Sequence, residues 1–213
     1  MNTSQDLVHP ELAGVHVDAD SEDFSRSEVI LKGALAAGAV YGAVMVGPFV
    51  RQALAMSESG DVGILNFALT LEYLESSFYE EAKKRAKPSG ELKKLVDLLA
   101  EDEQQHVEAL TATVKQLGGK PVTEPKFDFP YNDTASFLKL AQTFEDTGVS
   151  AYNGAAPSIE SKDVLASAGA IVQVEARHAA AIRLQNNQEP SPEAFDPTLD
   201  EAQVLKAVEP FIE

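Results

Sequence analysis

From about residue 59 onward, apolar residues recur every three or four positions, the spacing of one face of an α-helix. This pattern predicts four long helices, over residues 60–87, 90–117, 133–156 and 160–187, and a short final helix near 200–212 that packs outside the other four. The residues predicted to face inward are Leu65, Ala68, Glu72, Ser76, Tyr79, Leu99, Glu103, His106, Leu110, Val114, Leu138, Ala141, Glu145, Tyr152, Val164, Ala168, Ile171, Glu175, His178 and Ile182. Several of them are acids, histidines or tyrosines, so polar chemistry is expected inside the bundle.

The links between these helices predict how the chain is connected. The first link and the third link are only a few residues long, so each joins an antiparallel pair of helices. The middle link, residues 119–132, has three prolines and no helical period. At about 3.3 Å per residue it reaches on the order of 46 Å, enough to cross from one end of the bundle to the other. The expected fold class is therefore an all-α four-helix bundle with a long crossover.

A short motif, Glu-x-x-His, occurs at residues 103–106 and again at residues 175–178. A single glutamate precedes each copy by 30 or 31 residues, and a tyrosine follows that glutamate by seven residues. The two copies are offset by 72 or 73 residues and comprise Glu72, Tyr79, Glu103, His106, Glu145, Tyr152, Glu175 and His178. Residues three apart on a helix share a face, so each motif places a carboxylate beside an imidazole. Four carboxylates and two imidazoles from four helices are the set with which a helix bundle binds two iron or manganese ions.

The chemistry of burial supports a metal site at these positions. Four carboxylates inside an apolar bundle cost several kcal/mol each and repel one another unless most are protonated. Two divalent cations balance four carboxylates, while the histidines bind as neutral imidazoles. Carboxylates and imidazoles accept both iron and manganese, so the ligand types do not choose between them.

Two features near the motif, the tyrosines and a glycine, each have two interpretations. Tyr79 and Tyr152 either donate to a metal-binding carboxylate or are core aromatics whose hydroxyl groups are satisfied elsewhere. Gly148 permits either close helix packing or room for an exogenous ligand. Five glutamates of the first two helices lie off the inward stripes and are expected on solvated faces: Glu75, Glu80, Glu81, Glu101 and Glu108.

The N-terminal quarter of the chain differs from the rest. Residues 1–28 are acidic and aperiodic and are predicted to be a disordered leader, and residues 29–55 are predicted to be an export signal or a membrane anchor. The apolar stretch 29–50 with the small residues Ala53-Leu54-Ala55 fits a cleaved export signal. An uncleaved anchor and an apolar helix packed on the bundle are the alternatives. The expected location is extracytoplasmic, exported or membrane-anchored; the alternative is cytoplasmic.

Composition excludes several classes of function. The chain has 17 lysines and arginines against 34 acids, a net charge of −17, and this argues against nucleic acid as a partner. It has no cysteine, which excludes disulfides, thiolate chemistry, iron–sulfur clusters and a rubredoxin-type iron site. The oligomeric state is left open, a homo-oligomer included.

The segment from Asn66 to Tyr79 resembles the first helix of a known group of proteins. With the repeated motif, it gives residues 59–187 a resemblance to the ferritin-like superfamily, and more narrowly to the bacterial ferritin-like domain group that includes desiccation-related proteins. Residues 188–213 are then a C-terminal extension. The symmetric ligand set is more similar to rubrerythrins and manganese catalases than to classical ferritins.

The resemblance implies a role for each predicted ligand. Glu103 and Glu175 would bridge the two ions. Glu72 and His106 would bind one ion, and Glu145 and His178 the other. The implied function is a di-iron or dimanganese carboxylate protein that reacts with oxygen or peroxide, as a ferroxidase, peroxidase or catalase does, in oxidative or desiccation stress. The alternative is a metal-binding or structural stress protein without catalysis.

Overall fold

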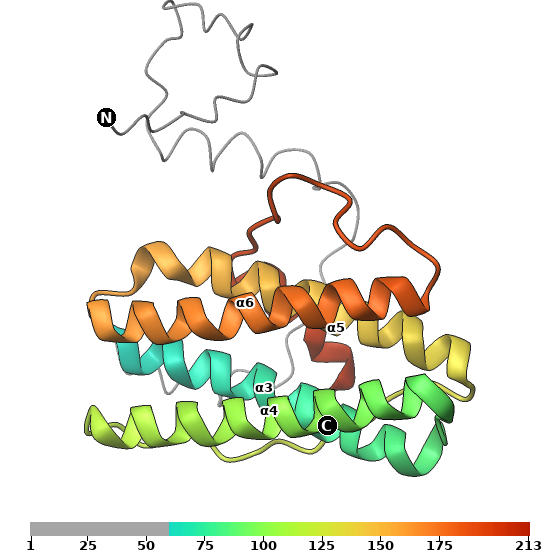
Figure 1. Cartoon of the computed structure of the whole chain (residues 1–213). Helices are drawn as coiled ribbons and strands as arrows, with labels where there is room; N and C mark the ends of the chain where they lie inside the picture. The colour runs from blue at the N-terminus through green and yellow to red at the C-terminus, as the bar shows by residue number, and fades with distance from the viewer. Residues whose placement is uncertain (1–59) are drawn as a thin grey trace, which may run out of the picture.

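The computed structural model describes residues 60–213, and its regular structure there is helical (Figure 1). The helices are α3 (Asp61–Arg85), α4 (Gly90–Gln116), α5 (Thr134–Ala155), α6 (Lys162–Gln185) and α7 (Glu201–Val208), with 3₁₀ turns at Ala156–Ser158 and Glu209–Phe211. The all-α class is confirmed, and the four long helices begin and end within two residues of the predicted bounds. The predictions for residues 1–28 and 29–55 lie outside the described residues.

The four long helices form two hairpins. In Figure 1, α3 and α4 make one layer and α5 and α6 the other. The closest packing is between α3 and α4 and between α5 and α6, and weaker contacts of α3 with α5 and of α4 with α6 join the hairpins. The links within the hairpins are short, so the helices of each pair run antiparallel. None of the helices within residues 60–213 has the length and apolar character needed to span a membrane.

Local sequence signals set where the long helices end. Helix α4 stops before Gly118, whose positive φ of 81° lets the chain turn back so that Gly119 donates to the carbonyl of Val114. Helix α5 starts in a capping box, in which the carboxylate of Asp133 accepts from the backbone of Ser136 and the Ser136 hydroxyl accepts from the backbone of Asp133. These signals determine where α4 ends and where α5 begins.

The link between α4 and α5 runs along α3. At one end, the side chain of Asn66 donates to the carbonyl of Lys120 and accepts from the backbone of Val122. At the other end, the buried rings of Phe129 and Tyr131 pack on Phe78, with ring centroids 5.2 and 5.6 Å from it. Twelve residues of helix separate Asn66 from Phe78, about 18 Å. The link therefore connects opposite ends of the bundle, as its length predicts.

The C-terminal extension closes over α5. The backbone N–H of Leu199 donates to the carbonyl of Ser150 at 3.0 Å. A Cβ atom at Gly154 would lie 1.9 Å from the Leu199 carbonyl oxygen, so only glycine permits this approach. Helix α7 follows and packs on α5, where its Val204 and Val208 join the hydrophobic core.

Every residue predicted to face inward is buried. The apolar ones fall into two clusters. One is centred on Leu74, Phe78 and Leu99, and the other on Leu69, Leu110 and Ile171. The acids and histidines of the repeated motif occupy the helical turns between these clusters. The core is therefore two apolar regions separated by a polar layer.

Candidate metal centre

The polar layer contains all six side chains predicted to bind metal. Each of the four long helices contributes at least one of them. The glutamate that begins each copy, Glu72 or Glu145, lies on α3 or α5, and the two Glu-x-x-His motifs lie on α4 and α6. The four carboxylates have no exposed surface, and His106 and His178 are 9% and 4% exposed. Groups of this kind are rarely buried without a partner.

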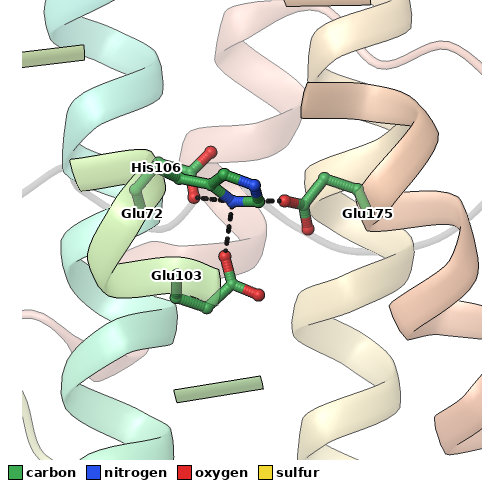
Figure 2. Close-up of side chains that lie close together, drawn as sticks. All are labelled: Glu72, Glu103, His106 and Glu175. Atoms are coloured by element: carbon green, nitrogen blue, oxygen red, sulfur yellow. Dashed lines mark hydrogen bonds and ion pairs between the residues drawn. The ribbon is translucent and has the colours of Figure 1, made fainter. Parts of the chain in front are cut away.

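His106 lies at the centre of one half of the layer (Figure 2). Its Nδ1 atom is 3.2 Å from Glu72 Oε2, 2.9 Å from Glu103 Oε2 and 2.9 Å from Glu175 Oε1. The three carboxylates come from α3, α4 and α6. One N–H cannot donate well to three carboxylates at once, whereas a cation can bind all of them.

His178 lies at the centre of the other half. Its Nδ1 atom is 2.8 Å from Glu103 Oε1, 3.8 Å from Glu145 Oε2 and 3.9 Å from Glu175 Oε2. The rings of His106 and His178 have centroids 6.2 Å apart. The two halves are therefore neighbouring parts of one layer.

Glu103 and Glu175 belong to both halves. Each directs one carboxylate oxygen at His106 and the other at His178. Ligand atoms within 4.8 Å of one another form two groups, Glu72, Glu103, His106 and Glu175 in one and Glu103, Glu145, Glu175 and His178 in the other. Two groups that share two carboxylates are the arrangement that two bridged cations need.

The tyrosines connect the hairpins crosswise. The Tyr79 hydroxyl on α3 donates to Glu145 Oε1 on α5 at 2.5 Å, and the Tyr152 hydroxyl on α5 donates to Glu72 Oε1 on α3 at 2.5 Å. Of the two interpretations of these tyrosines, the hydrogen bond to a site carboxylate is the one observed. Each bond fixes the orientation of a carboxylate whose other oxygen faces a histidine.

Asp102 is a member of the site that the sequence interpretation missed. Its Oδ2 atom lies 3.1 Å from His178 Nε2, on the side of the ring away from the carboxylate cluster. The residue at the same place in the second motif is Val174. A carboxylate on the outer nitrogen orients a metal-binding histidine and increases its basicity. No spacing rule in the sequence singles out Asp102, because its partner is on another helix.

When no cation is bound, the carboxylates keep both histidines protonated. Burial opposes the charged form of His106, but contacts with Glu103, Glu175 and Glu72 raise its pKa to about 12. Burial also opposes the charge on His178, and contacts with the nearby carboxylates, that of Glu103 above all, raise its pKa to about 10. The protons thus carry positive charge that a metal ion would otherwise supply.

The carboxylates divide into two kinds. Burial raises the pKa of Glu72 to about 8, and burial likewise raises the pKa values of Glu145 and Glu175 above the usual range. Burial acts in the same direction on Glu103, but contacts with both histidines outweigh it and lower its pKa to about 2. The site therefore binds protons when no metal ion is present, and metal binding has to release them.

Several buried atoms indicate that the site fits cations. Among the described residues, Glu103 Oε1, Glu145 Oε2, both carboxylate oxygens of Glu175 and His178 Nδ1 make no well-aligned hydrogen bond. This holds although His178 Nδ1 lies 2.8 Å from Glu103 Oε1 and His106 Nδ1 lies 2.9 Å from Glu175 Oε1. A buried polar atom without a hydrogen bond lowers the stability of the folded protein. All of them are ligand atoms for a divalent transition metal. The donor set and its geometry are compatible with two metal ions.

One expectation about the site is wrong. Glu75 was expected on a solvated face, but it is 2% exposed and lies beside the polar layer. It stands three residues after Glu72, a spacing that shares a helical face, so the sequence did contain a signal. Gly148 lies opposite it. A Cβ atom there would be 3.1 Å from Glu75 Oε1 and 3.7 Å from Glu175 Oε2. The absence of a side chain at Gly148 leaves room for the carboxylate of Glu75.

The family model of the ferritin-like domain matches residues 60–188, which is more than half of the chain and includes all four long helices. The chain belongs to this family. No curated protein matches it. Membership in the ferritin-like domain family confirms the resemblance at the level of the superfamily and accounts for the bundle with its long crossover. The match ends before α7, which lies in the C-terminal extension of this ferritin-like chain.

Proposed function

We propose that this protein binds a pair of iron or manganese ions at the centre of its bundle. Glu103 and Glu175 bridge the pair. Glu72 and His106 bind one ion, and Glu145 and His178 bind the other. The observation that carries this proposal is the shared position of Glu103 and Glu175, each with one oxygen towards each histidine.

The proposed reaction is a redox reaction with oxygen or peroxide, in protection against oxidative or desiccation stress. Two redox-active ions held side by side supply the electrons for such chemistry. The protein contributes a buried layer that excludes water and fixed carboxylate orientations. The hydroxyls of Tyr79 and Tyr152 hold Glu145 and Glu72 in place. Family membership supports the metal centre, and the stress role rests on the resemblance to desiccation-related proteins.

Metal analysis of natively purified protein tests the metal centre. We expect two metal ions per chain in the wild type and none in a Glu103→Ala, Glu175→Ala double variant, because both bridges are lost. Exposed Glu101 gives a matched control, since Glu101→Ala removes a carboxylate from the same helix outside the layer. Retention of two ions in the double variant would refute the bridging assignment.

The reaction is tested on the metal-loaded protein. Oxygen uptake after addition of iron(II), or oxygen release from hydrogen peroxide with manganese bound, is the expected outcome. The double variant provides the background rate. If the loaded wild type does not exceed that background in either assay, the redox proposal fails while the metal site stands.

A second candidate is a metal-binding protein without catalysis. It is favoured by the burial of four carboxylates with few hydrogen bonds, because cations that neutralise them would stabilise the bundle whatever else they do. This candidate predicts that metal raises the melting temperature while both redox assays stay at background.

We also propose that the protein is exported or held at a membrane through residues 29–55, with a cytoplasmic location as the alternative. The support is the apolar stretch 29–50 and the small residues that follow it. Mass spectrometry of the intact native protein tests this. A cleaved signal removes about residues 1–55 from the chain, whereas a retained anchor leaves the chain whole and in the membrane fraction.

A further inference from the structure

The C-terminal extension forms an outer wall beside the polar layer. A small pocket lies between α3 and α5, lined by residues of both helices, Glu75 and Gly148 among them, and by Val208. Val208 belongs to α7, the short dark-red helix of Figure 1. This helix lies beyond the residues that match the ferritin-like domain, so the bundle alone would leave the pocket without this wall.

The pocket adjoins the candidate ligands because α5 has no side chain at Gly148. A Cβ atom there would lie 3.1 Å from Glu75 Oε1 and 3.7 Å from Glu175 Oε2. Glu175 is one of the two carboxylates that face both histidines. The pocket that Val208 closes is therefore next to a shared carboxylate of the proposed centre.

Helix α7 is held in place by a small apolar contact. It has eight residues, too few for a stable helix in water without packing. Its buried side chains are Val204 and Val208, and the turn after it places Phe211 against Phe144, with ring centroids 4.9 Å apart. The link that leads to it is exposed at every position from 191 to 197. Segments with little buried apolar surface open more easily than the rest of a fold, so α7 is expected to detach while the bundle stays folded.

The end of the chain is fastened to the crossover link by one short bridge. Phe127 of the link pairs with Ile212 in the antiparallel sense. Two backbone hydrogen bonds of 3.0 Å flank the pair, from Asp128 N–H to the Phe211 carbonyl and from Glu213 N–H to the Lys126 carbonyl. The Cα atoms of a pair flanked in this way are about 4.5 Å apart. This bridge is the point at which the extension can be fastened by design.

We propose that residues 199–213 form a cover of the metal centre, and that α7 has to move away from α5 before metal ions enter or leave. This inference rests on the proposed metal centre. When the cover is closed, Val208 separates the pocket from water. When it is open, water and cations reach the pocket, where the polar side chain nearest the candidate ligands is the carboxyl group of Glu75.

A disulfide that fastens the cover tests this proposal in the full-length protein. In a Phe127→Cys, Ile212→Cys variant, the two positions have a Cα separation that a disulfide can span. The chain has no other cysteine, so the oxidised and the reduced form of one protein can be compared. The measured quantity is the rate at which manganese(II) is lost to excess EDTA. We expect the oxidised form to lose it about 10-fold more slowly or slower still, and equal rates would overturn the proposal.

A second variant loosens the cover. Val204 is 0% exposed and does not line the pocket, so Val204→Ala weakens the packing of α7 and leaves the pocket wall unchanged. We expect it to lose manganese(II) about 10-fold faster than the wild type. Val164→Ala makes the same change on α6, where the side chain is 4% exposed, and should exchange like the wild type. If both variants speed the loss equally, it follows overall stability and the cover is refuted.

Hydrogen exchange of the metal-free protein gives a readout that needs no metal ion. The amides of α7 should exchange faster than those of residues 144–151 on α5, and the disulfide should slow them. If α7 exchanges as slowly as α5, it does not open, and the cover is refuted even where metal binds. If the wild type binds neither manganese(II) nor iron(II), the metal centre is refuted and the role of the cover in metal exchange with it, whereas hydrogen exchange still shows whether α7 opens.

Discussion

The repeated motif occurs once in the hairpin of α3 and α4 and once in the hairpin of α5 and α6. The two hairpins match at some positions and differ at others. The positions that match are those whose side chains face the middle of the layer: the first glutamate, the tyrosine seven residues later, and the Glu-x-x-His pair. The positions that differ are occupied by residues close to these ligands in the sequence. Glu75 stands opposite Gly148, and Asp102 corresponds to Val174. The comparison indicates that the two halves have the same set of candidate ligands but would give two bound ions different surroundings.

The largest effect is expected from removing one half of the ligands at a time. A Glu72→Ala, His106→Ala variant and a Glu145→Ala, His178→Ala variant should each bind one ion in place of two, because the bridging glutamates remain. Metal analysis after dialysis measures this. If either variant loses both ions while the other keeps one, the halves are not equivalent and one ion depends on the other.

The pH dependence of stability is the next largest effect. It distinguishes the two halves of the site because their histidines have different pKa values. The folded-state pKa of Glu72 is raised to about 8. A raised pKa contributes stability that is complete below the ordinary pKa and is lost as the pH rises through the folded value. Since the ordinary pKa of a glutamate is 4.5, the metal-free protein should lose about 1.4 kcal/mol per pH unit for this proton between pH 4.5 and about pH 8.

The protons of His178 and His106 contribute with the same sign, because the stability they provide is lost from the ordinary pKa of 6.5 up to about 10 and about 12. The order arises because the Nδ1 atom of His106 lies within 3.2 Å of three carboxylates, whereas the Nδ1 atom of His178 has only that of Glu103 so close. Thermal unfolding between pH 6 and pH 9 and NMR titration of the two imidazoles measure these effects. A melting temperature that rises with pH in the metal-free protein would contradict them. Bound metal should flatten the dependence, since the ions replace the protons.

Removal of Asp102 is a smaller change that affects one half only. Asp102→Asn keeps the shape of the side chain but weakens its interaction with His178 Nε2. The affinity for one of the two ions should therefore fall by about 10-fold. A two-site titration shows whether one dissociation constant moves and the other stays. Asp97→Asn, an exposed acid of the same helix that pairs with Lys93, is the matched control. An equal change of both dissociation constants would argue against a local role for Asp102.

The smallest expected difference is between the two tyrosines. Tyr79→Phe and Tyr152→Phe each remove a donor to a buried carboxylate, and each should lower the free energy of unfolding by about 1–3 kcal/mol. Because both bonds are 2.5 Å long and cross in the same way, the two losses should be equal. Chemical denaturation measures them, with Tyr73→Phe on α3 as a control outside the layer. A marked inequality would show that the halves differ even at their matched positions.

Much of this site was predictable because the sequence patterns that define it span only a few residues and occur twice. A Glu-x-x-His pair on a helix directs both side chains to one face, and the inward stripes of all four helices follow from the spacing of apolar residues. The tyrosines were predicted to bond a site carboxylate, but only as one of two interpretations. That each tyrosine reaches the glutamate of the other hairpin could not be read from the chain, because it depends on how the hairpins face one another.

Other features could not be predicted from the sequence for the same reason. Glu75 was assigned to a solvated face, since it lies just off the stripe defined by Glu72 and Tyr79, yet the glycine on α5 makes a buried place for it. Asp102 had no signal, because its neighbours in the sequence say nothing about His178 on another helix. The close approach of Leu199 to Gly154 likewise joins segments that are distant along the chain.

The sequence by itself determined the helices, the length of the crossover, the ferritin-like family and the set of side chains in the polar layer. These follow from periodicity, chain length and a motif present twice, all of which act over a few residues or are counted along the chain. Only the tertiary structure decided which carboxylates are shared between the halves, which tyrosine holds which glutamate, and that Glu75 belongs beside the centre. Those are contacts between helices, and their geometry is set by the packing of side chains whose positions no single helix fixes.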